Sequence, residues 1–475
     1  MSPPGAFDCI CSPGKSPPFR RTERLGRGDS RTLSSLARPF NTPKCSHKCP
    51  PSSSAGTTTA LRQVFGYFMS PSLSHFKRRR MQATSMAFRN RWCFNFFVLS
   101  AALLGASCKG EPAPAKGLEA DIEEVAATLI EQPLLHSTSI AVVYRGKEFT
   151  HHRGDMVAGT PGVPSDATLY EIGSLSKTLA GTLAANAVLE LKISLDDDIR
   201  KYLQDDYPNL QYHGEPIRIR HLLSHTSGLP NMLPERANTV LADFTDRRTP
   251  AELNAIYASY GKGEFFKDLH TVEIGRAPGK EYAYSSTGTE LVAHVLEVVY
   301  KSDYESLLRG FLRDSMAMTD TRIRLGDADA TRLAVGYHSD NPLPTTAMPQ
   351  LPWGASGNVK ATVPEMVKYL RFQLANGPVV EESHRTLVNF DPEFGIGYFW
   401  NIVSGDRLKG RYYAHHGGVP RSQCYVYIIP KYDLGIFIIT NQSGDHTARA
   451  MEAAVDTLVE RIAALEHTVD QSHSR

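Results

Sequence analysis

Three short segments, far apart in the chain, carry residue types that could activate a serine for attack on a carbonyl group. They are Ser174-x-x-Lys177, Tyr284 with Ser286, and the run that begins at His415. A lysine three residues after a serine lies on the same face of a helix. When such a lysine is partly desolvated, it can lose its proton and serve as a base for the serine hydroxyl. Together the segments favour a chemistry that passes through an acyl-enzyme.

The two later segments would supply a second proton-transfer group and a wall for a developing oxyanion. A tyrosine near two cations is expected to have a depressed pKa, so Tyr284 could take the proton of Ser174. His415, followed by Gly417 and Gly418, could present backbone N–H groups without side-chain obstruction. Taken alone, each segment also fits a structural role, as a capped helix, a packed ring or a turn with exposed histidines. Ser-x-x-Lys occurs four times in the chain, so context and order select the copy at Ser174.

The sequence gives little indication of a metal or another cofactor. His221 and His225 are four residues apart and could chelate a metal ion, but no glutamate or third ligand is placed as in His-Glu-x-x-His. Neither common type of glycine-rich phosphate loop occurs. We therefore expect no cofactor. A metal-dependent hydrolase that uses the two histidines stays open as an alternative, which a chelator would inactivate.

The formal net charge of +2 over 475 residues conceals two oppositely charged parts. Residues 1–80 hold 14 Lys and Arg against 3 Asp and Glu, so the remainder of the chain is net acidic. That remainder contains no basic stripe with interleaved aromatic residues, which argues against nucleic acid as a partner. A small molecule or a peptide is the expected substrate, and the oligomeric state stays open.

The N-terminal part is expected to precede one folded domain over residues 118–467. Residues 1–80 are rich in Pro, Ser and Arg, and would be disordered or untranslated. Residues 81–108 have the basic start and the short apolar run of an export signal. The small residues before Cys108 are similar to a lipoprotein cleavage box. They predict a lipid anchor on Cys108 and a place in the periplasm or at the outer membrane, with 109–117 as a linker.

The domain itself has predicted strands at both ends and helices between them. The pattern predicts helices over 117–132, 174–192 and 448–465, a further helix beginning at 194–198, and strands at 139–144, 148–153, 422–429 and 434–440. From about 200 to 380 helices and loops dominate. We therefore expect an α+β fold, in which one antiparallel sheet is built from both ends of the domain and is flanked by helices, with an inserted all-helical part.

Two phrases carry a family resemblance: residues 170–178 (YEIGSLSKT) and residues 219–230 (IRHLLSHTSGLP). With the order Ser-x-x-Lys, Tyr-x-Asn-like, His-x-Gly, the chain resembles the serine β-lactamase-related hydrolases over nearly all of 117–465. This group includes class C β-lactamases, DD-peptidases and esterases. The resemblance implies a β-lactamase/transpeptidase-like fold, with Ser174 as nucleophile, Lys177 as its activating partner and Tyr284 as general base. It also implies His415 at the wall, and the N–H groups of Ser174 and Gly418 as the oxyanion hole.

Two departures from the family pattern bear on the substrate. Ser286 replaces the asparagine of Tyr-x-Asn, so it keeps a hydrogen-bonding group but loses the amide. Arg421 stands where glycine is usual and could face an acidic substrate group. These changes favour an esterase, amidase or peptidase over a true β-lactamase. The segment from Asn231 to Arg276 is expected to roof the site. The alternative is a non-catalytic cell-envelope binding or scaffold protein on the same fold.

Overall fold

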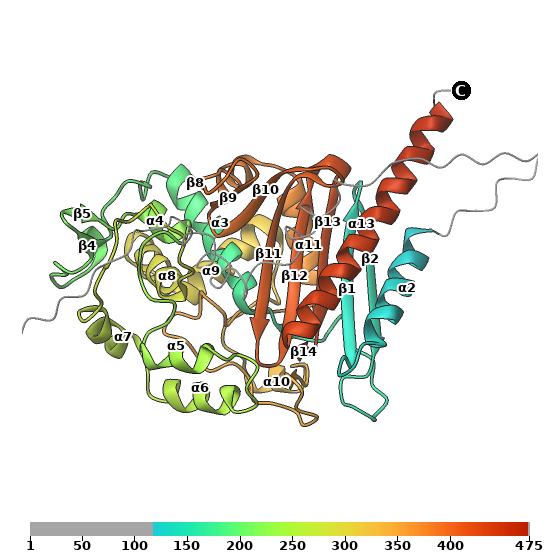
Figure 1. Ribbon diagram of the computed structural model, residues 1–475, viewed down its shortest axis with the longest axis horizontal. Helices are drawn as coiled ribbons and strands as arrows, with labels where there is room; N and C mark the ends of the chain where they lie inside the picture. Colours follow the sequence, from blue (N-terminus) through green and yellow to red (C-terminus); the bar gives the residue numbers. More distant parts are fainter. Residues whose placement is uncertain (1–116, 474–475) are drawn as a thin grey trace, which may run out of the picture. The chain divides into compact units, whose positions relative to one another are not determined.

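An eight-stranded antiparallel sheet forms the centre of the domain in the computed structural model, which describes residues 117–473 (Figure 1). The strand order is β2-β1-β13-β12-β11-β10-β9-β8. The strands are β1 (Ser137–Tyr144), β2 (Lys147–Gly154), β8 (Val388–Asn389), β9 (Phe394–Gly397), β10 (Trp400–Asp406), β11 (Gly410–Val419), β12 (Ser422–Ile429) and β13 (Leu434–Thr440). The predictions for residues 1–80, for 81–108 and for the linker up to residue 116 lie outside the described residues.

Both ends of the domain build this sheet, as the sequence pattern predicted. Strand β1 pairs antiparallel with β13, with Ser139 opposite Ile439. The Ser137 N–H donates to Asn441 Oδ1 at 3.0 Å, across 304 residues of sequence. Both strands are almost continuously buried. Their runs of Val, Ile and other apolar residues suit strands that are covered on both faces.

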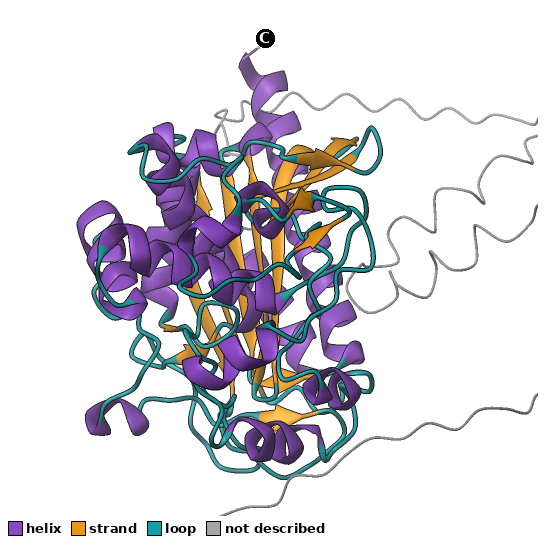
Figure 2. Cartoon of the chain, turned by 90° about the vertical axis from the view of Figure 1, so that its left-hand side faces the viewer, coloured by secondary structure: helices purple, strands orange, loops and turns teal. Residues whose placement is uncertain are grey.

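Helices cover the two faces of the sheet (Figure 2). The covering helices are α2 (Leu118–Ile130) and α13 (Asp445–His473) on one face, and α3 (Ser176–Leu189) and α11 (Val363–Leu374) on the other. Neighbouring residues of β1 divide between them, because successive side chains of a strand point to opposite faces. Ile140 belongs to the core under α2 and α13, and Ala141 to the core under α3 and α11. The predicted fold class is confirmed.

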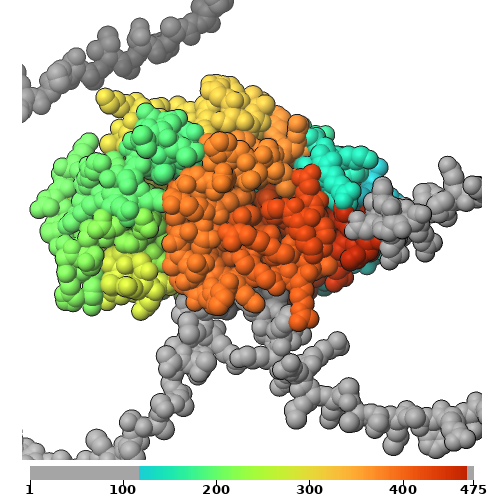
Figure 3. All heavy atoms as spheres, turned by 90° about the horizontal axis from the view of Figure 1, so that it is seen from above, coloured from blue at the N-terminus to red at the C-terminus, as the bar shows by residue number. Residues whose placement is uncertain are grey.

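The excursion between the two parts of the sheet is mostly helical, as predicted. It contains α4 (Ile219–Leu223), α5 (Arg236–Leu241), α6 (Thr249–Tyr257), α7 (Lys262–Leu269), α8 (Ser286–Tyr300), α9 (Tyr304–Met316), α10 (Asp327–Ala330) and α12 (Pro378–Ser383). In Figure 3 the green and yellow part of the chain lies beside the orange part. Helix α8 packs against α3, α4 and α9. This packing brings the start of α8 close to the start of α3.

Some local predictions are wrong. The helix predicted to begin at 194–198 is only a short 3₁₀ helix at Ile199–Tyr202, preceded by a turn. Asp198 caps it, since its carboxylate accepts the Arg200 N–H at 3.0 Å. The helix predicted to reach residue 192 ends at Leu189, and Leu191 follows with a left-handed φ of 58°. Strands β9 and β10 were not predicted. Among residues 117–473, no helix combines the length and the apolar character needed to cross a bilayer.

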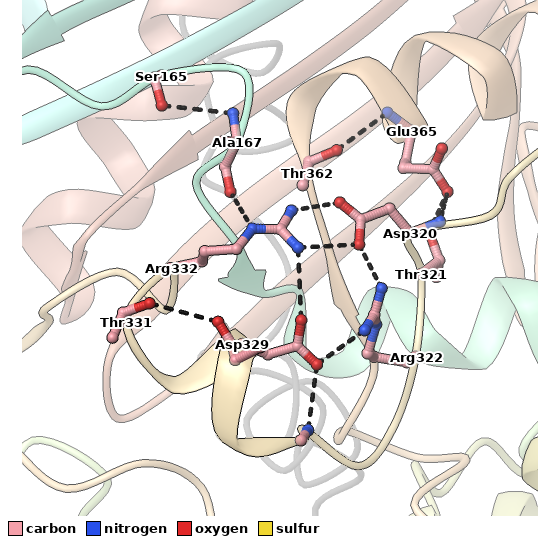
Figure 4. Close-up of polar contacts among 12 residues, drawn as sticks. Ser165, Ala167, Asp320, Thr321, Arg322, Asp329, Thr331, Arg332, Thr362 and Glu365 are labelled. Carbon is pink, nitrogen blue, oxygen red and sulfur yellow. Dashed lines mark hydrogen bonds and ion pairs between the residues drawn. The ribbon is translucent and has the colours of Figure 1, made fainter.

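A network of ion pairs fixes the segment that leads towards the candidate nucleophile (Figure 4). Arg332 Nη1 donates to Asp320 Oδ1 at 3.1 Å, and Arg322 Nη1 donates to Asp329 Oδ2 at 2.7 Å. Arg332 Nε also donates to the carbonyl oxygen of Ala167 at 3.0 Å. The loop that carries these charges is therefore tied to the chain just before strand β3 (Tyr170–Glu171). Pairs that are largely shielded from solvent hold such geometry better than exposed pairs do.

Candidate active site

Ser174 lies in a 3₁₀ turn between strand β3 (Tyr170–Glu171) and helix α3. Strand β3 is held by antiparallel pairing with β7 (Lys360–Ala361). The residue before the serine, Gly173, has a φ of +53°, which glycine adopts at little steric cost. The chain can therefore pass from strand to helix within a few residues. The prediction that Ser174 stands where a strand ends and a helix begins is confirmed.

Two of the predicted side chains lie within hydrogen-bonding distance of Ser174 Oγ. The Tyr284 hydroxyl donates to Ser174 Oγ at 2.8 Å, although the two residues are 110 positions apart. Lys177 Nζ donates to the same oxygen at 3.2 Å, and it lies 4.7 Å from the centre of the Tyr284 ring. The start of α3 and the loop before α8 thus bring a hydroxyl, an amine and a phenol together.

Lys177 is completely buried, with no exposed surface. Burial lowers the pKa of its ammonium to about 7, against an opposing effect of the Glu290 carboxylate. Its Nζ also donates to the carbonyl oxygen of Ser356 at 2.6 Å. A lysine with a pKa near 7 is partly neutral at physiological pH and can accept a proton. The alternative that Lys177 is only a solvated charge on the surface of a capped helix is therefore ruled out.

Tyr284 does not have the depressed pKa that the sequence suggested. Burial raises the pKa of its hydroxyl, and the hydrogen bond to Ser174 lowers it only in part. The expected second cation is missing, because burial and then the Lys177 charge lower the pKa of His415 to about 3. Burial also lowers the pKa of His225, whose ring centre lies 4.5 Å from that of Tyr284. Tyr284 is thus a neutral hydroxyl at neutral pH, and Lys177 is the better base.

Strand β11 forms the wall beside Ser174. Its pairing with β10 reaches only to Ala414, which lies opposite Asn401, whereas its pairing with β12 continues to Val419. In the strand pairing of the described residues, residues 415–419 of β11 therefore pair with β12 only, and their other edge has no partner strand. A Cβ atom on Gly173 would lie 2.8 Å from the backbone nitrogen of Gly418. Gly418 is thus placed against the nucleophile turn, where an oxyanion donor is needed.

Gly417 has a steric role at this contact. A Cβ atom at residue 417 would lie 2.1 Å from the carbonyl oxygen of Ile172 and 2.6 Å from Cys424 Sγ. The buried Cys424 thiol donates to the same carbonyl at 3.3 Å. Strand β11 can approach the segment before Ser174 only because residue 417 has no side chain. The glycine thereby sets how close Gly418 comes to the nucleophile.

A tight turn of two aromatic residues precedes β10, so β10 begins too late to cover the edge of β11 beyond Ala414. Tyr398 and Phe399 join β9 to β10 and have φ values of 50° and 70°, a pattern that Asn-Gly usually fills in two-residue hairpins. Both side chains are buried. A Cβ atom on Gly181 of α3 would lie 2.2 Å from the Tyr398 carbonyl oxygen. Tight packing therefore offsets a backbone cost of about 1–3 kcal/mol per residue.

The two histidines of the wall point to opposite sides of the sheet, as neighbours on a strand do. His415 is buried close enough to Lys177 for the lysine charge to lower its pKa, and its Nδ1–H donates to the His416 carbonyl at 2.8 Å. The His416 ring lies 4.6 Å from that of Tyr425, which packs against the core under α13. Of the two histidines, His415 belongs to the site.

Ser286, which replaces the family asparagine, begins helix α8. It lines a cavity of about 10 Å³ together with Glu290 and Ser356, which is close to the least space that can hold one water molecule. Its backbone N–H donates to Asn231 Oδ1 at 3.3 Å. Met232, Leu233, Tyr257 and Phe265 line the same cavity. Part of the segment 231–276, expected to roof the site, therefore packs beside it.

Arg421 does not support the expectation of a cation for an acidic substrate group. Its Nε donates to the carbonyl oxygen of Thr345 at 3.2 Å. Its charge also lowers the pKa of the buried Glu171 carboxyl, which burial raises more strongly. The guanidinium thus has partners within the protein.

His221 and His225, the alternative metal pair, support the backbone. Nδ1 of His221 accepts the Arg218 N–H at 3.1 Å, and Nδ1 of His225 accepts the Ser285 N–H at 3.2 Å. Within residues 117–473, no group of three or more potential metal-ligating side chains gathers at one place. The contact of His225 fixes the residue that follows Tyr284.

Two residues of the site were not predicted. Ser356 acts through its carbonyl oxygen, which no side-chain motif reveals. Glu290 accepts backbone N–H groups from the loop that contains Ser356. It had a signal in the sequence, because a carboxylate directly precedes the apolar residues Leu291–Ala293. An acid on the buried side of a helix needs partners, so it marks a polar contact inside the protein.

Comparison with known proteins agrees with this geometry. The family model described as Beta-lactamase matches residues 122–460, so the chain belongs to this family of serine hydrolases. Protein flp of Staphylococcus aureus (strain MRSA252) is 23% identical over 349 residues, which cover 70% of this chain and 65% of the relative. A Beta-lactamase of Providencia stuartii is 24% identical over 270 residues, covering 57% and 63%. The matches thus span just under two thirds of the length of these curated relatives.

Solved structures share the fold. A Beta-lactamase/D-alanine carboxypeptidase from Yersinia pestis, complexed with citrate, superposes with a TM-score of 0.61 at 19% identity, covering 74% of this chain and 99% of the other. A class C beta lactamase from Rhodobacter sphaeroides gives 0.58 at 18% identity, covering 72% and 99%. At such low identity the likeness concerns the fold, and the chemistry must be argued from the residues of this chain.

Proposed function

We propose that the protein cleaves an ester or amide bond through an acyl-enzyme formed on Ser174. One observation carries the proposal: Ser174 Oγ lies 2.8 Å from the Tyr284 hydroxyl and 3.2 Å from Lys177 Nζ, and the pKa of that lysine is about 7. A nucleophile beside a base of matched pKa is the arrangement that acyl transfer requires. Membership of the family supports a hydrolase, and the kind of bond is our inference.

The reaction would proceed in two halves. In acylation, Ser174 Oγ bonds to the substrate carbonyl carbon while neutral Lys177 takes the hydroxyl proton, and the carbonyl electron pair moves to the oxygen. The N–H groups of Ser174 and Gly418 would stabilise that oxyanion. As the bond to the leaving group breaks, the Tyr284 hydroxyl gives it a proton and regains one from Lys177. Water then attacks the acyl-enzyme by the same route, releasing the acid and restoring Ser174.

The wall of the site favours neutral esters and amides over substrates that carry a carboxylate. His415 is uncharged, since its pKa is about 3, and Arg421 contacts Thr345. Lys177 is already engaged with Ser174 and the Ser356 carbonyl. At these positions a substrate carboxylate would lose water and would gain less from cations that already have partners within the protein. We therefore place esterase, amidase or peptidase activity ahead of true β-lactamase activity.

The test is intact-mass labelling of the purified protein, with Ser174→Ala as control. One sample receives a fluorophosphonate and another a penicillin. A fluorophosphonate adduct that is absent from the variant would establish Ser174 as an activated nucleophile. We expect penicillin to acylate slowly or not at all. Absence of both adducts on folded protein would reject the proposal and support the non-catalytic scaffold.

We also propose export and attachment to the membrane through a lipid on Cys108. The support is the signal-like segment 81–108 and the small residues before Cys108. Two acyl chains suffice to hold a protein stably at a bilayer. Mass spectrometry of the membrane fraction is expected to find a modified peptide that begins at Cys108. An unmodified Cys108 in the mature protein would refute the lipid.

A further inference from the structure

A buried carboxylate of helix α8 holds the loop that touches Lys177. Glu290 is 3% exposed. Its Oε2 accepts the N–H groups of Trp353 at 2.7 Å and Gly354 at 3.0 Å, and its Oε1 accepts that of Ser356 at 2.8 Å. Three donors from one short loop meet one carboxylate, which favours its ionised form and fixes the loop.

The same loop supplies a ligand to the catalytic amine. The carbonyl oxygen of Ser356 accepts from Lys177 Nζ at 2.6 Å, against 3.2 Å for the contact of Nζ with Ser174 Oγ. The loop is also fixed on its far side, where the Val359 N–H donates to Ser176 Oγ at 3.1 Å. The Ser356 carbonyl oxygen therefore positions Lys177 Nζ, and the position of that carbonyl in turn depends on Glu290.

The charges around Lys177 point to the same carboxylate. Facing the lysine are Tyr284, from the loop before α8, His225, from the loop after α4, and His415, from β11. All three are neutral at neutral pH by the direction of their pKa shifts. Among the described residues, Glu290 is the acid whose charge raises the pKa of Lys177, which burial lowers. Removing the Glu290 charge should therefore lower that pKa further.

Two phenols lie near enough to Glu290 for its charge to act on them. Burial raises the pKa of Tyr257 of α6 and of Tyr304 of α9, and the Glu290 charge raises both further. Both phenols stay neutral. Burial raises the pKa of Glu290 as well, and its hydrogen bonds to the loop oppose that shift. The carboxylate thus acts on the loop and on Lys177.

We propose that Glu290 is a positioning residue of the hydrolytic site. It holds the Ser356 carbonyl against Lys177 Nζ, and so it sets where the amine lies and at which pH it becomes a base. This inference rests on the proposed function, because it assumes that Lys177 activates Ser174. Glu290 itself touches neither Ser174 nor the substrate.

Glu297, two turns further along α8, is a matched control. It accepts Trp353 Nε1–H at 2.7 Å, the Tyr304 N–H at 2.8 Å and Lys262 Nζ at 2.7 Å. It therefore holds the same tryptophan from the same helix. Its contacts do not include the Ser356 N–H, so its removal should affect stability without changing the proton affinity of Lys177.

The experiment measures the rate of fluorophosphonate labelling of Ser174 from pH 5 to 9 in the wild-type protein, Glu290→Gln, Glu290→Asp and Glu297→Gln. In the wild-type protein the labelling rate should rise with pH as Lys177 becomes neutral, and this rise is the acid limb of the profile. We expect the acid limb of Glu290→Gln to lie about one pH unit lower, as for the loss of one nearby opposite charge. The labelling rate of this variant at high pH, the plateau of the profile, should fall about tenfold, because the Lys177 amine is less well positioned against Ser174. In Glu297→Gln the limb should stay in place.

Glu290→Asp separates position from charge, since it keeps the anion but withdraws it from the loop. We expect its limb near that of the wild type and its plateau reduced. A Glu290→Gln limb at the wild-type pH would overturn the proposal; if that variant does not fold, a wild-type plateau for Glu290→Asp would do so. Absence of labelling in the wild-type protein itself would instead reject the proposed function.

Discussion

Gly173 and Gly418 are packed so closely that a methyl group on Gly173 would lie 2.8 Å from the Gly418 nitrogen. An alanine at residue 173 must therefore push strand β11 away from the nucleophile turn, and it must also bear a φ of +53°. We expect Gly173→Ala to lower kcat/KM for an ester at least ~100-fold, because the oxyanion donor moves. The free energy of unfolding should fall by about 1–3 kcal/mol.

Gly159→Ala is the control for this variant. Gly159 has a φ of +72°, and no atom lies within 4 Å of the place that an added methyl group would occupy. The variant therefore carries the backbone cost without the collision. It should lose about 1 kcal/mol of stability and keep its activity. An equal loss of activity in both variants would show that the Gly173–Gly418 contact is not what matters.

The pH dependence of catalysis should follow Lys177. Since burial lowers the pKa of this lysine to about 7, kcat/KM should rise through pH ~7 as the amine becomes neutral, and then level off. Lys177→Met should lose at least ~100-fold in kcat at every pH. A wild-type profile without a limb between pH 6 and 8 would remove Lys177 from the role of base.

The burial of Lys177 should also lower the free energy of unfolding, by an amount that depends on pH. Its pKa is lower in the folded than in the unfolded protein, so the unfolded state binds more protons between pH ~7 and ~10.5. Stability should therefore rise with pH across that window. Lys177→Met should be more stable than the wild type by on the order of 1–3 kcal/mol at pH 7, and the difference should shrink by pH 10. Urea unfolding at the two pH values measures it.

Ser286→Asn tests what the missing amide means for the substrate. The cavity beside Ser286 holds about 10 Å³, so part of a longer side chain can be accommodated there. Asparagine would offer both a donor and an acceptor to a substrate amide. We expect penicillin acylation to become at least ~10-fold faster relative to ester hydrolysis. An unchanged ratio would mean that another feature sets the preference.

The ion-pair network of residues 320–332, which is tied to the segment before β3, should contribute more to stability than surface pairs do. Asp329 accepts from Arg322 Nη1 at 2.7 Å and is only 9% exposed at its side chain. Asp329→Ala should lower the free energy of unfolding by about 2–3 kcal/mol, because it removes one of the two carboxylates that Arg322 and Arg332 share, and Asp320 alone must then balance both arginines. Asp314→Ala removes an exposed pair with Arg313 and should change stability by less than about 0.5 kcal/mol. Equal effects would contradict the difference in burial.

The fold was largely predictable because its signals are local. Strands β1 and β13 contain continuous apolar runs, and α2 has apolar residues at helical spacing. Strand β10 escaped notice because its burial is irregular and because it begins after a turn formed by Tyr398 and Phe399, which are not turn-forming residues. Tertiary packing against Gly181 decides that turn, and packing cannot be read from local sequence.

The sequence indicated which residues form the site, but it did not indicate their protonation states. The order of the motifs, together with the resemblance to the β-lactamase-related hydrolases, singled out Ser174, Lys177 and Tyr284 as one group. The direction of the Tyr284 pKa could not be inferred, because it depends on how deeply the ring is buried and on His415 being uncharged. The contact of Ser356 with Lys177 is made by a backbone carbonyl, which every residue carries.

The pairing of β1 with β13 has a consequence for how the protein is made. The two strands lie side by side in the sheet, and the hydrogen bond from Ser137 to Asn441 spans 304 residues. During synthesis, β1 can pair with β2 at once, but its other neighbour, β13, does not exist until nearly the whole domain has been made. Contacts of such long range slow folding. The active site, whose wall belongs to the same late-arriving sheet, can be assembled only after the ribosome has completed the C-terminal strands.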